Sequence, residues 1–248
     1  MMISFGAYSA ETSLKFKNDE SFYQTFKNDL ISPVTEGHST SILVGSTAVI
    51  LEALIFKDQN KKLVRSISAS KPLGKYSKDF ELMGQVVPNI AYVLYNGAVG
   101  ASTNNSKSLY LAGLMARSTF SSALTTNILK YSVREKRPDP SNAKNSFPSG
   151  HTTTAFAFAS VVGYQHGPCW GSASYLMASL VGLSRLNDNA HYAHDVIAGA
   201  FIGTIYGISI SQRDENHLST TNQSNKTSFD FYPIFSDKLA GVHFDISL

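Results

Sequence analysis

The fold is decided by residues 148–211, which read PSGHTTTAFAFASVVGYQHGPCWGSASYLMASLVGLSRLNDNAHYAHDVIAGAFIGTIYGISIS. Three apolar segments lie in this stretch, over 151–165, 172–186 and 195–211. Each is long enough for a helix and too long for an ordinary strand. This part of the chain is therefore expected to form three consecutive helices.

The same pattern continues toward the N-terminus. Further apolar segments cover 41–56, 85–101 and 107–130, which brings the expected number of core helices to six. The sequence contains no repeat, and strand and helix patterns do not alternate along it. An α/β fold is therefore not indicated. A chain of 248 residues is long enough for one domain with a sizeable core. We expect an all-α fold with a six-helix core bundle over residues 37–212.

The N-terminal end of the chain differs from this core. Residues 1–36 are polar with scattered aromatic residues and form an expected N-terminal extension. Within it, 21–31 is expected to be an amphipathic helix that Pro33 stops, because proline breaks a helix interior. A lysine-rich stretch over 57–78 lies outside the six expected helices.

The C-terminal end, residues 213–248, is expected to be a polar linker followed by a short β-hairpin. Apolar and polar side chains largely alternate over 229–235 and 242–246, with turn-forming residues between them. A hairpin alone is marginally stable, so this one is expected to pack on something.

Composition excludes several classes of function. The net charge of +3 is too small to favour nucleic acid, and no basic stripe interleaved with aromatic residues is present. Cys169 is the single cysteine, so no disulfide within the chain is possible. No Cys/His cluster has zinc spacing. The first 15 residues lack a basic segment followed by an apolar run, so no signal peptide is expected.

Three short clusters of cations, histidines and small residues stand at the ends of the expected helices. They are Lys130 with Arg137 and Pro138, then Pro148-Ser149-Gly150-His151, then Ser184 and Arg185 with His191 and Asp195. In an up-and-down bundle, the end of the third helix, the start of the fourth, the end of the fifth and the start of the sixth lie at one end. The three clusters are therefore expected to converge.

The cations in these clusters suit a phosphate group. Arginine forms bidentate hydrogen bonds to phosphate, whereas lysine acts as a point charge, so Lys130, Arg137 and Arg185 are candidate phosphate ligands. The start of the fourth helix adds free N–H groups near Ser149 and Gly150. No carboxylate cluster for a metal is visible, so these groups are expected to stabilise the transition state without one.

His191 is the candidate nucleophile. Asp195 lies one helical turn later and can accept the N–H of the far ring nitrogen, which orients the imidazole. His151 is then available to protonate the leaving oxygen. The expected course is attack by His191, a phosphohistidine intermediate, and hydrolysis by a water that His151 activates.

Other polar residues near the clusters are expected to play smaller parts. His194 stands beside Asp195 in sequence, but in a helix it points about 100° away, so no essential role is expected. Arg134, Lys136 and Lys144 are interpreted as solvated loop charges.

Together, the three clusters resemble the three-part signature of the type 2 phosphatidic acid phosphatase superfamily. The resemblance implies an all-α core and hydrolysis of a phosphomonoester or pyrophosphate without a metal or other cofactor. It implies His191 as nucleophile and His151 as acid. It also implies a set of phosphate ligands, which are Lys130, Arg137, Ser149, Gly150 and Arg185. The segment over 189–195 resembles bacterial lipid-phosphatase members, so a phosphorylated lipid is the expected substrate.

Three alternatives stay open. Soluble periplasmic acid phosphatases share the reaction but act on small phosphomonoesters. Vanadium haloperoxidases belong to the same superfamily, although they are generally much larger. A non-catalytic protein would use the site only to bind an anionic headgroup, and the intact pair of His191 and Asp195 argues against it.

Location is the least determined property. A membrane-spanning helix needs about 20 apolar residues, and the apolar segments here are mostly shorter and contain Ser, Thr, Asn and Gly. Mean hydropathy is −0.08, although the polar ends depress it. Residues 158–183 lack any charged residue apart from His166, which favours a membrane protein over a soluble bundle. The resemblance implies an extracytoplasmic active site, whereas the lysine-rich stretch at the same end would favour the cytoplasm.

Overall fold

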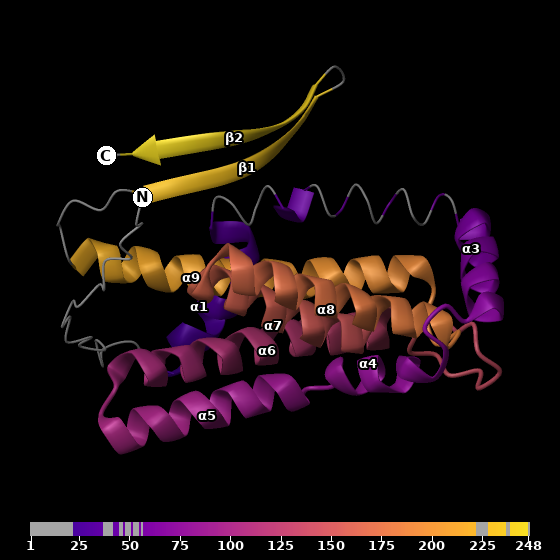
Figure 1. Cartoon of the computed structure of the whole chain (residues 1–248), viewed down its shortest axis with the longest axis horizontal. Helices are drawn as coiled ribbons and strands as arrows, with labels where there is room; N and C mark the ends of the chain where they lie inside the picture. The colour runs from indigo at the N-terminus through magenta and orange to yellow at the C-terminus, as the bar shows by residue number, and fades with distance from the viewer. Residues whose placement is uncertain are drawn as a thin grey trace, which may run out of the picture. The chain divides into compact units, whose positions relative to one another are not determined.

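The computed structural model describes residues 22–36, 42–44, 47, 51, 55, 57–221, 228–236 and 239–247. The chain forms two units, Met1–Arg213 and Asp214–Leu248. The helical elements are α1 (Phe22–Thr35), α3 (Lys57–Ser70), the 3-10 helix η1 (Gly74–Tyr76), α4 (Ser77–Met83), α5 (Val87–Thr103), α6 (Ser106–Val133), α7 (Gly150–His166), α8 (Pro168–Asn187) and α9 (Ala193–Thr221) (Figure 1).

The prediction of an all-α fold is confirmed. Five of the six expected core helices correspond to α5 through α9. The remaining expected helix, the first in chain order over 41–56, lies largely outside the described residues. Local signals explain several helix ends. Prolines lie in the first turns of α5 and α8, where a backbone N–H would have no intrahelical acceptor. The side chain of Asn105 caps α6 by accepting the N–H of Ser108 at 3.1 Å.

The lysine-rich stretch over 57–78 proves to be largely helical, because α3, η1 and the start of α4 occupy it. Its helices have few apolar residues, and tertiary contacts stabilise them instead. Both α3 and α4 pack against α8. Val64 of α3 is buried, and the hydroxyl of Ser77 in α4 donates to Asp188 at 2.9 Å.

The expected stop of the first helix at Pro33 is wrong, since α1 continues to Thr35. Proline lacks the N–H that would bond to the carbonyl four residues earlier. In α1 that carbonyl belongs to Asp29, and the Ser32 hydroxyl donates to it at 2.8 Å. The neighbouring side chain thus replaces the bond that proline removes.

The core of the first unit is built around α7, which packs against α6 and α8. Leu114 and Met115 of α6 meet Val161 of α7 and Tyr206 and Ile210 of α9 in one buried cluster. Four helix ends lie together with α3 and α4 at the right-hand end in Figure 1. They are the C-terminal ends of α6 and α8 and the starts of α7 and α9.

The contact between α7 and α9 is unusually close. Gly199, Gly203 and Gly207 follow one another at four-residue spacing along α9 and face the backbone and small side chains of α7. A Cβ atom at Gly203 would overlap the carbonyl oxygen of Thr153. Glycine is therefore required here by the approach of the two helices. This contact fixes the start of α9 against the start of α7.

The second unit contains two strands, β1 (Ser228–Ser236) and β2 (Leu239–Ser247), which pair antiparallel from Ser228↔Ser247 to Ser236↔Leu239. Both strands are longer than the segments predicted from alternation. The segment predicted as a polar linker is partly helical, because α9 continues to Thr221.

Candidate active site

The loop between α6 and α7 folds back over the helix ends. The N–H of Arg137 donates to the carbonyl of Ala143, and the N–H of Ser146 donates to the carbonyl of Glu135, each at 3.0 Å. The Arg137 side chain donates from Nε to Oδ1 of Asn145 at 2.8 Å. These bonds hold Arg137 and Ser146 at the bundle end where the three clusters meet.

A cavity of about 390 Å³ lies at this end. Five of the eight predicted site residues line it, and the corner between α4 and α5 closes one side through Gly84, Gln85 and Val86. The five residues are Lys130, Arg137, Gly150, His151 and His191. The structure therefore brings together side chains from four separate parts of the chain.

Lys130 is held at the start of α7. Its Nζ donates to the carbonyl oxygens of Pro148 at 2.6 Å and Asn145 at 2.7 Å. Burial lowers the pKa of Lys130 to about 8, and the nearby positive charge of Arg137 acts in the same direction. An anion entering the cavity would oppose both effects, so the lysine is suited to bind one.

The start of α7 supplies backbone donors from Gly150 onward. The first intrahelical bond runs from the N–H of Thr153 to the carbonyl of Ser149 at 3.0 Å, which leaves the N–H groups of Gly150 and His151 outside the helical ladder. Ser149 differs from the expectation. Its N–H donates to the carbonyl of Asp195 at 2.9 Å, and its buried hydroxyl accepts from Thr152. Its N–H is therefore occupied in joining α7 to α9.

Arg185 lies behind the cavity rather than on its wall. Its guanidinium is buried and forms an ion pair at 2.8 Å with Glu81 of α4. Glu81 was not among the residues predicted from the sequence, because no helix was expected in that stretch. The charge of Arg185 reaches His151 nonetheless: burial lowers the pKa of His151 to about 4, and Arg185 adds to the shift. His151 is thus neutral near pH 7 before substrate binds.

His191 and Asp195 meet as predicted from their spacing. Nδ1 of His191 lies 3.5 Å from Oδ2 of Asp195, and both side chains are buried. The same oxygen accepts the hydroxyl of Ser146 at 2.6 Å and the N–H of Tyr192 at 2.8 Å. Burial lowers the pKa of His191, although the carboxylate of Asp195 opposes the shift. The imidazole is therefore neutral, as a nucleophile requires.

His194 does not point away from Asp195, contrary to the expectation. Its Nε2 lies 3.2 Å from Oδ1 of Asp195 and 2.9 Å from Oε2 of Glu135. The ring is fully buried and stacks on Tyr192, with Phe147 on a second side. Helical side chains lean toward the N-terminus, which lets the carboxylate of Asp195 reach back to this ring.

Glu135, His194 and Asp195 are also the group of described residues whose ligand atoms lie close enough to share a metal ion. The contact of 2.9 Å between His194 and Glu135 is a hydrogen bond, whereas Oδ1 of Asp195, 3.2 Å from the same ring nitrogen, has no hydrogen-bond partner among the described residues. The sequence signal for this network was a histidine directly before the aspartate and a glutamate two residues before Arg137.

Comparison with known proteins gives a consistent picture. Residues 109–217 match the family model described as the PAP2 superfamily. A lipid A 1-phosphatase of Porphyromonas gingivalis is 45% identical over 84 residues, which cover 33% of this chain and 19% of that protein. A lipid A 1-phosphatase of Rhizobium johnstonii is 27% identical over 189 residues, covering 67% of this chain and 77% of its own. The chain thus spans about a fifth of the first relative and most of the second.

Among solved structures, a transmembrane PAP2-type phosphatidylglycerolphosphate phosphatase from Bacillus subtilis has a similar fold. The TM-score is 0.61 at 18% identity, over 71% of this chain and 96% of that one. At this identity the similarity bears on the fold alone. The family match ends at residue 217, so the two strands lie outside it.

Proposed function

Since the chain belongs to the PAP2 superfamily, we propose that it is a lipid phosphatase. It removes phosphate from a phosphomonoester or pyrophosphate without a metal. The observation that carries the proposal is a cavity that joins Lys130, Arg137 and the start of α7 with two histidines. Residues 37–212 form the catalytic domain in this proposal.

The reaction proceeds by two displacements at phosphorus. Nε2 of His191 attacks while Nδ1 faces Asp195, the bond from phosphorus to the leaving oxygen breaks, and His151 gives that oxygen a proton. A water then attacks the phosphohistidine, His151 takes its proton, and phosphate leaves. Lys130, Arg137 and the N–H of Gly150 stabilise the charge on the phosphoryl oxygens, and the charge of Arg185 adds to this from behind the cavity wall. Ser149 positions the start of α7, since its N–H already donates to Asp195.

His151 must carry a proton in the first step. Its pKa of about 4 in the free protein makes it neutral at pH 7. A phosphate dianion in the cavity favours the charged imidazolium and raises the pKa of His151 again. Substrate binding thereby favours protonation of His151, which can then give its proton to the leaving oxygen.

The surroundings of the cavity support a lipid substrate. Its α4–α5 side continues into exposed apolar side chains, among them Leu82, Val86, Val87 and Ile90, which are all between 43% and 51% exposed. Apolar side chains beside a cationic site suit a molecule with a charged head and acyl chains. This apolar margin favours a lipid substrate over the small phosphomonoester of a soluble acid phosphatase.

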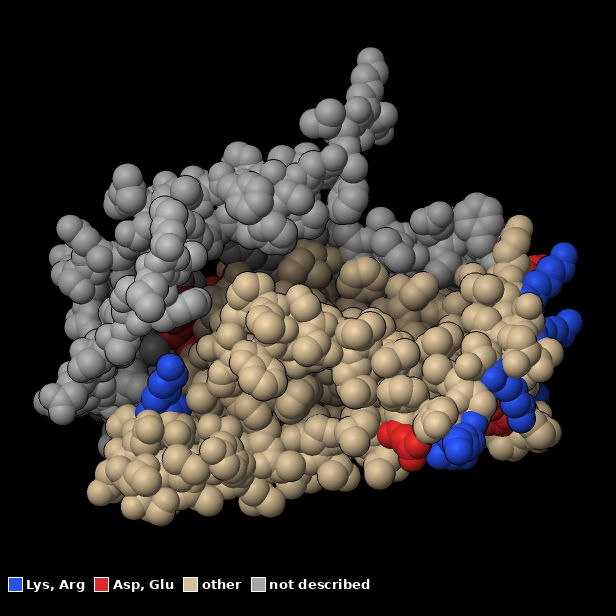
Figure 2. Space-filling view, in the orientation of Figure 1, with Lys and Arg blue, Asp and Glu red and all other residues tan. Residues whose placement is uncertain are grey.

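The wider surface supports a position at a membrane. Figure 2 shows acidic and basic side chains gathered mainly at the end with α3 and α4, while the face over α5, α6 and α8 is largely uncharged. Among the described residues, one helix has the length and hydropathy to cross a bilayer, α9 over Ala193–Glu215, and 61% of that apolar window is buried against the rest of the structure. The active site faces the extracytoplasmic side in this proposal, as in the superfamily members that the signature resembles.

Phosphate release tests the proposal. The purified chain in detergent is expected to hydrolyse phosphatidic acid faster than p-nitrophenyl phosphate, to remain active in EDTA and to be inhibited by vanadate. The variant His191→Ala is expected to lose turnover, because it removes the nucleophile, and acid-labile phosphate is expected on His191 of the parent chain. His166→Gln, at the far end of α7, serves as the control.

Three results would contradict parts of the proposal. Loss of activity in EDTA would exclude the metal-free reaction. Trapped phosphate on Ser149 would replace the nucleophile. A preference for p-nitrophenyl phosphate would favour the soluble acid phosphatase.

A further inference from the structure

Glu135, Ser146, His194 and Asp195 form a closed ring of contacts behind His191. The N–H of Ser146 donates to the carbonyl of Glu135 at 3.0 Å, and its hydroxyl donates to Oδ2 of Asp195 at 2.6 Å. Nε2 of His194 lies 2.9 Å from Oε2 of Glu135 and 3.2 Å from Oδ1 of Asp195. The ring of contacts therefore joins the α6–α7 loop to the start of α9 and reaches both oxygens of the Asp195 carboxylate.

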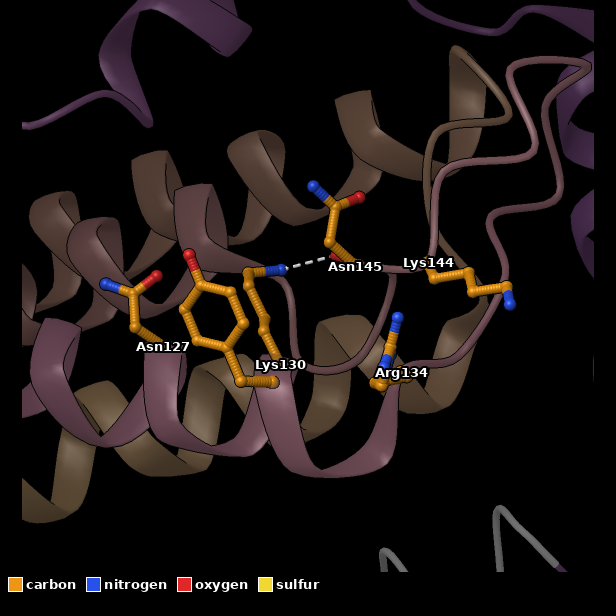
Figure 3. Close-up of a pocket in the computed structure, with 6 residues that line it drawn as sticks. Asn127, Lys130, Arg134, Lys144 and Asn145 are labelled. Carbon is orange, nitrogen blue, oxygen red and sulfur yellow. Dashed lines mark hydrogen bonds between the residues drawn. The ribbon is translucent and has the colours of Figure 1, made fainter.

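The loop side of this ring is fixed by the end of α6. Nζ of Lys130 donates to the carbonyl of Asn145 at 2.7 Å (Figure 3). That carbonyl and the N–H of Ser146 belong to one peptide group, and the N–H is bonded to Glu135. Glu135 follows the left-handed cap residue Arg134, whose own N–H donates to the carbonyl of Lys130 at 3.1 Å. The Ser146 hydroxyl is thus presented from a backbone that is held on both sides.

The imidazole of His194 is held on the other side of the ring. It is fully buried and stacks on Tyr192, with 5.4 Å between the ring centroids, and on Phe147 at 6.1 Å. Because an ionised carboxylate only accepts hydrogen bonds, Nε2 carries the proton that is donated to Glu135. Nδ1 has no hydrogen-bond partner among the described residues. Stacking and the bond from Nε2 together fix the plane of the imidazole.

The Asp195 carboxylate needs a contact on each oxygen to keep its direction. Nδ1 of His191 lies 3.5 Å from Oδ2, which is too long for this contact to hold the carboxylate by itself. Ser146 and the N–H of Tyr192 bond to the same oxygen, so the group could still pivot about Oδ2, and the last torsion of an aspartate is broadly distributed. The N–H of His194 faces Oδ1 and opposes this rotation.

We infer that Glu135 and His194 are positioning residues for the pair of His191 and Asp195. This role rests on the proposed function and deepens it. Glu135 holds the imidazole of His194, the imidazole restrains Asp195, and the carboxylate keeps the proton on Nδ1 of His191, which leaves Nε2 free to attack phosphorus. Neither Glu135 nor His194 lines the cavity, so both act through Asp195 and contact no substrate.

Two replacements of His194 test this role with phosphatidic acid as the substrate. His194→Phe keeps a flat ring to stack on Tyr192 but removes the N–H, whereas His194→Gln keeps an N–H near the place of Nε2. We expect kcat to fall about tenfold or more in His194→Phe while KM stays within about twofold, since a hydrogen bond to a charged group is lost. His194→Gln should recover most of the rate. Inhibition by inorganic phosphate should be unchanged in both variants, because Lys130 and Arg137 remain.

Glu135→Ala tests the outer end of the ring, where the side chain is 13% exposed and its removal disturbs the core less. We expect kcat to fall about three- to tenfold. Combining Glu135→Ala with His194→Phe should slow the reaction no further than His194→Phe alone, because both residues act through one carboxylate. Lys136→Ala and His166→Phe are the matched controls and should keep the parent kcat. Lys136 is the exposed neighbour of Glu135, and His166 lies at the far end of α7.

A parent value of kcat in His194→Phe would overturn the inference. Equal losses in His194→Phe and His194→Gln would also overturn it, because the N–H would then have no part in the effect. So would a loss of kcat that is matched by weaker inhibition by phosphate and a lower unfolding temperature, which indicates general damage. If His194→Phe does not fold, the kcat of Glu135→Ala decides, and a parent value there overturns the inference.

A parent chain that releases no phosphate would instead contradict the proposed function. Labelling of His191 by diethyl pyrocarbonate, followed by mass spectrometry, would still decide the inference. A misdirected imidazole should react more slowly in His194→Phe than in the parent chain and in His166→Phe. Equal rates of labelling in the three proteins would show that His194 does not position His191.

Discussion

At the scale of single residues, the carboxylate of Asp195 is the centre of the site. One oxygen accepts from Ser146 and the N–H of Tyr192 and faces His191, and the other faces His194. The bonds to Oδ2 fix the direction of the carboxylate, and through it the tautomer and orientation of His191.

Removing one of these neighbours should slow catalysis without preventing binding. Ser146→Ala deletes the 2.6 Å bond to Asp195 and is expected to lower kcat about tenfold while KM changes less than about twofold, since a bond to a charged group is lost. Ser146 touches no substrate in this scheme, so it is a positioning residue. Steady-state kinetics on phosphatidic acid measure the effect.

Two further variants distinguish positioning from simple loss of structure. Ser146→Thr retains the hydroxyl and should recover most of the rate. Ser141→Ala, in the exposed part of the same loop, should leave both constants unchanged. A normal kcat in Ser146→Ala would show that the hydroxyl has no part in orienting the dyad.

At the scale of elements, the pairing of α7 with α9 sets the site. The glycines of α9 let its backbone approach α7 closely enough for the Ser149 N–H to reach the Asp195 carbonyl at 2.9 Å. This bond joins the turn proposed to bind phosphate to the turn that carries the proposed nucleophile, His191. Small residues at a helix interface permit such an approach in water and in lipid alike.

A methyl group at this interface should therefore be costly. Gly203→Ala would place a Cβ atom against the backbone of Thr153 and Ala157, which cannot yield like a flexible side chain. The expected loss is about 1–3 kcal/mol of unfolding free energy, as for other overpacked cores. Chemical unfolding followed by circular dichroism measures it.

Gly113→Ala on α6 is the matched control, because no atom lies within 4 Å of a Cβ atom built there. It should be neutral or stabilise the protein by up to about 1 kcal/mol, the difference in helix propensity. Equal effects at the two sites would mean that propensity, and not close packing, decides the stability of the bundle.

At the scale of the whole molecule, charge and apolar surface are separated in the first unit. Ion pairs of α4 with α8 lie at the active-site end, as between Lys78 and Asp188, whereas exposed apolar side chains such as Leu94, Phe120 and Leu176 lie along the helices. Such a surface in water would favour aggregation. Insertion into or onto a bilayer removes that cost.

Extraction from membranes is the measurement at this scale. The expressed chain is expected to sediment with membranes, to remain there in high salt or alkaline carbonate, and to dissolve in detergent, because apolar contact and not charge holds it. A chain ending at Thr221 should behave identically, since it retains the whole of α9. Release by salt or carbonate would instead support the soluble periplasmic alternative.

Prediction from the sequence succeeded where local pattern was sufficient. Apolar segments gave α5 through α9, and their order indicated that Lys130, His151, His191 and Asp195 would meet, because helix ends alternate between the two ends of a bundle. Local sequence pattern did not predict α3 and α4, because these helices depend on contacts with α8. It also failed at Pro33, where a neighbouring hydroxyl replaces the missing bond.

Periodicity and residue type alone establish the helical class, the signature and the candidate roles of the residues in it. Which residues contact one another follows only from the folded structure. Glu81 meets Arg185, His194 and Ser146 meet Asp195, and Arg134 and Lys144 line a common cavity. These pairs join segments far apart in the chain or depend on a side chain's direction, and neither distance nor direction is encoded in local pattern.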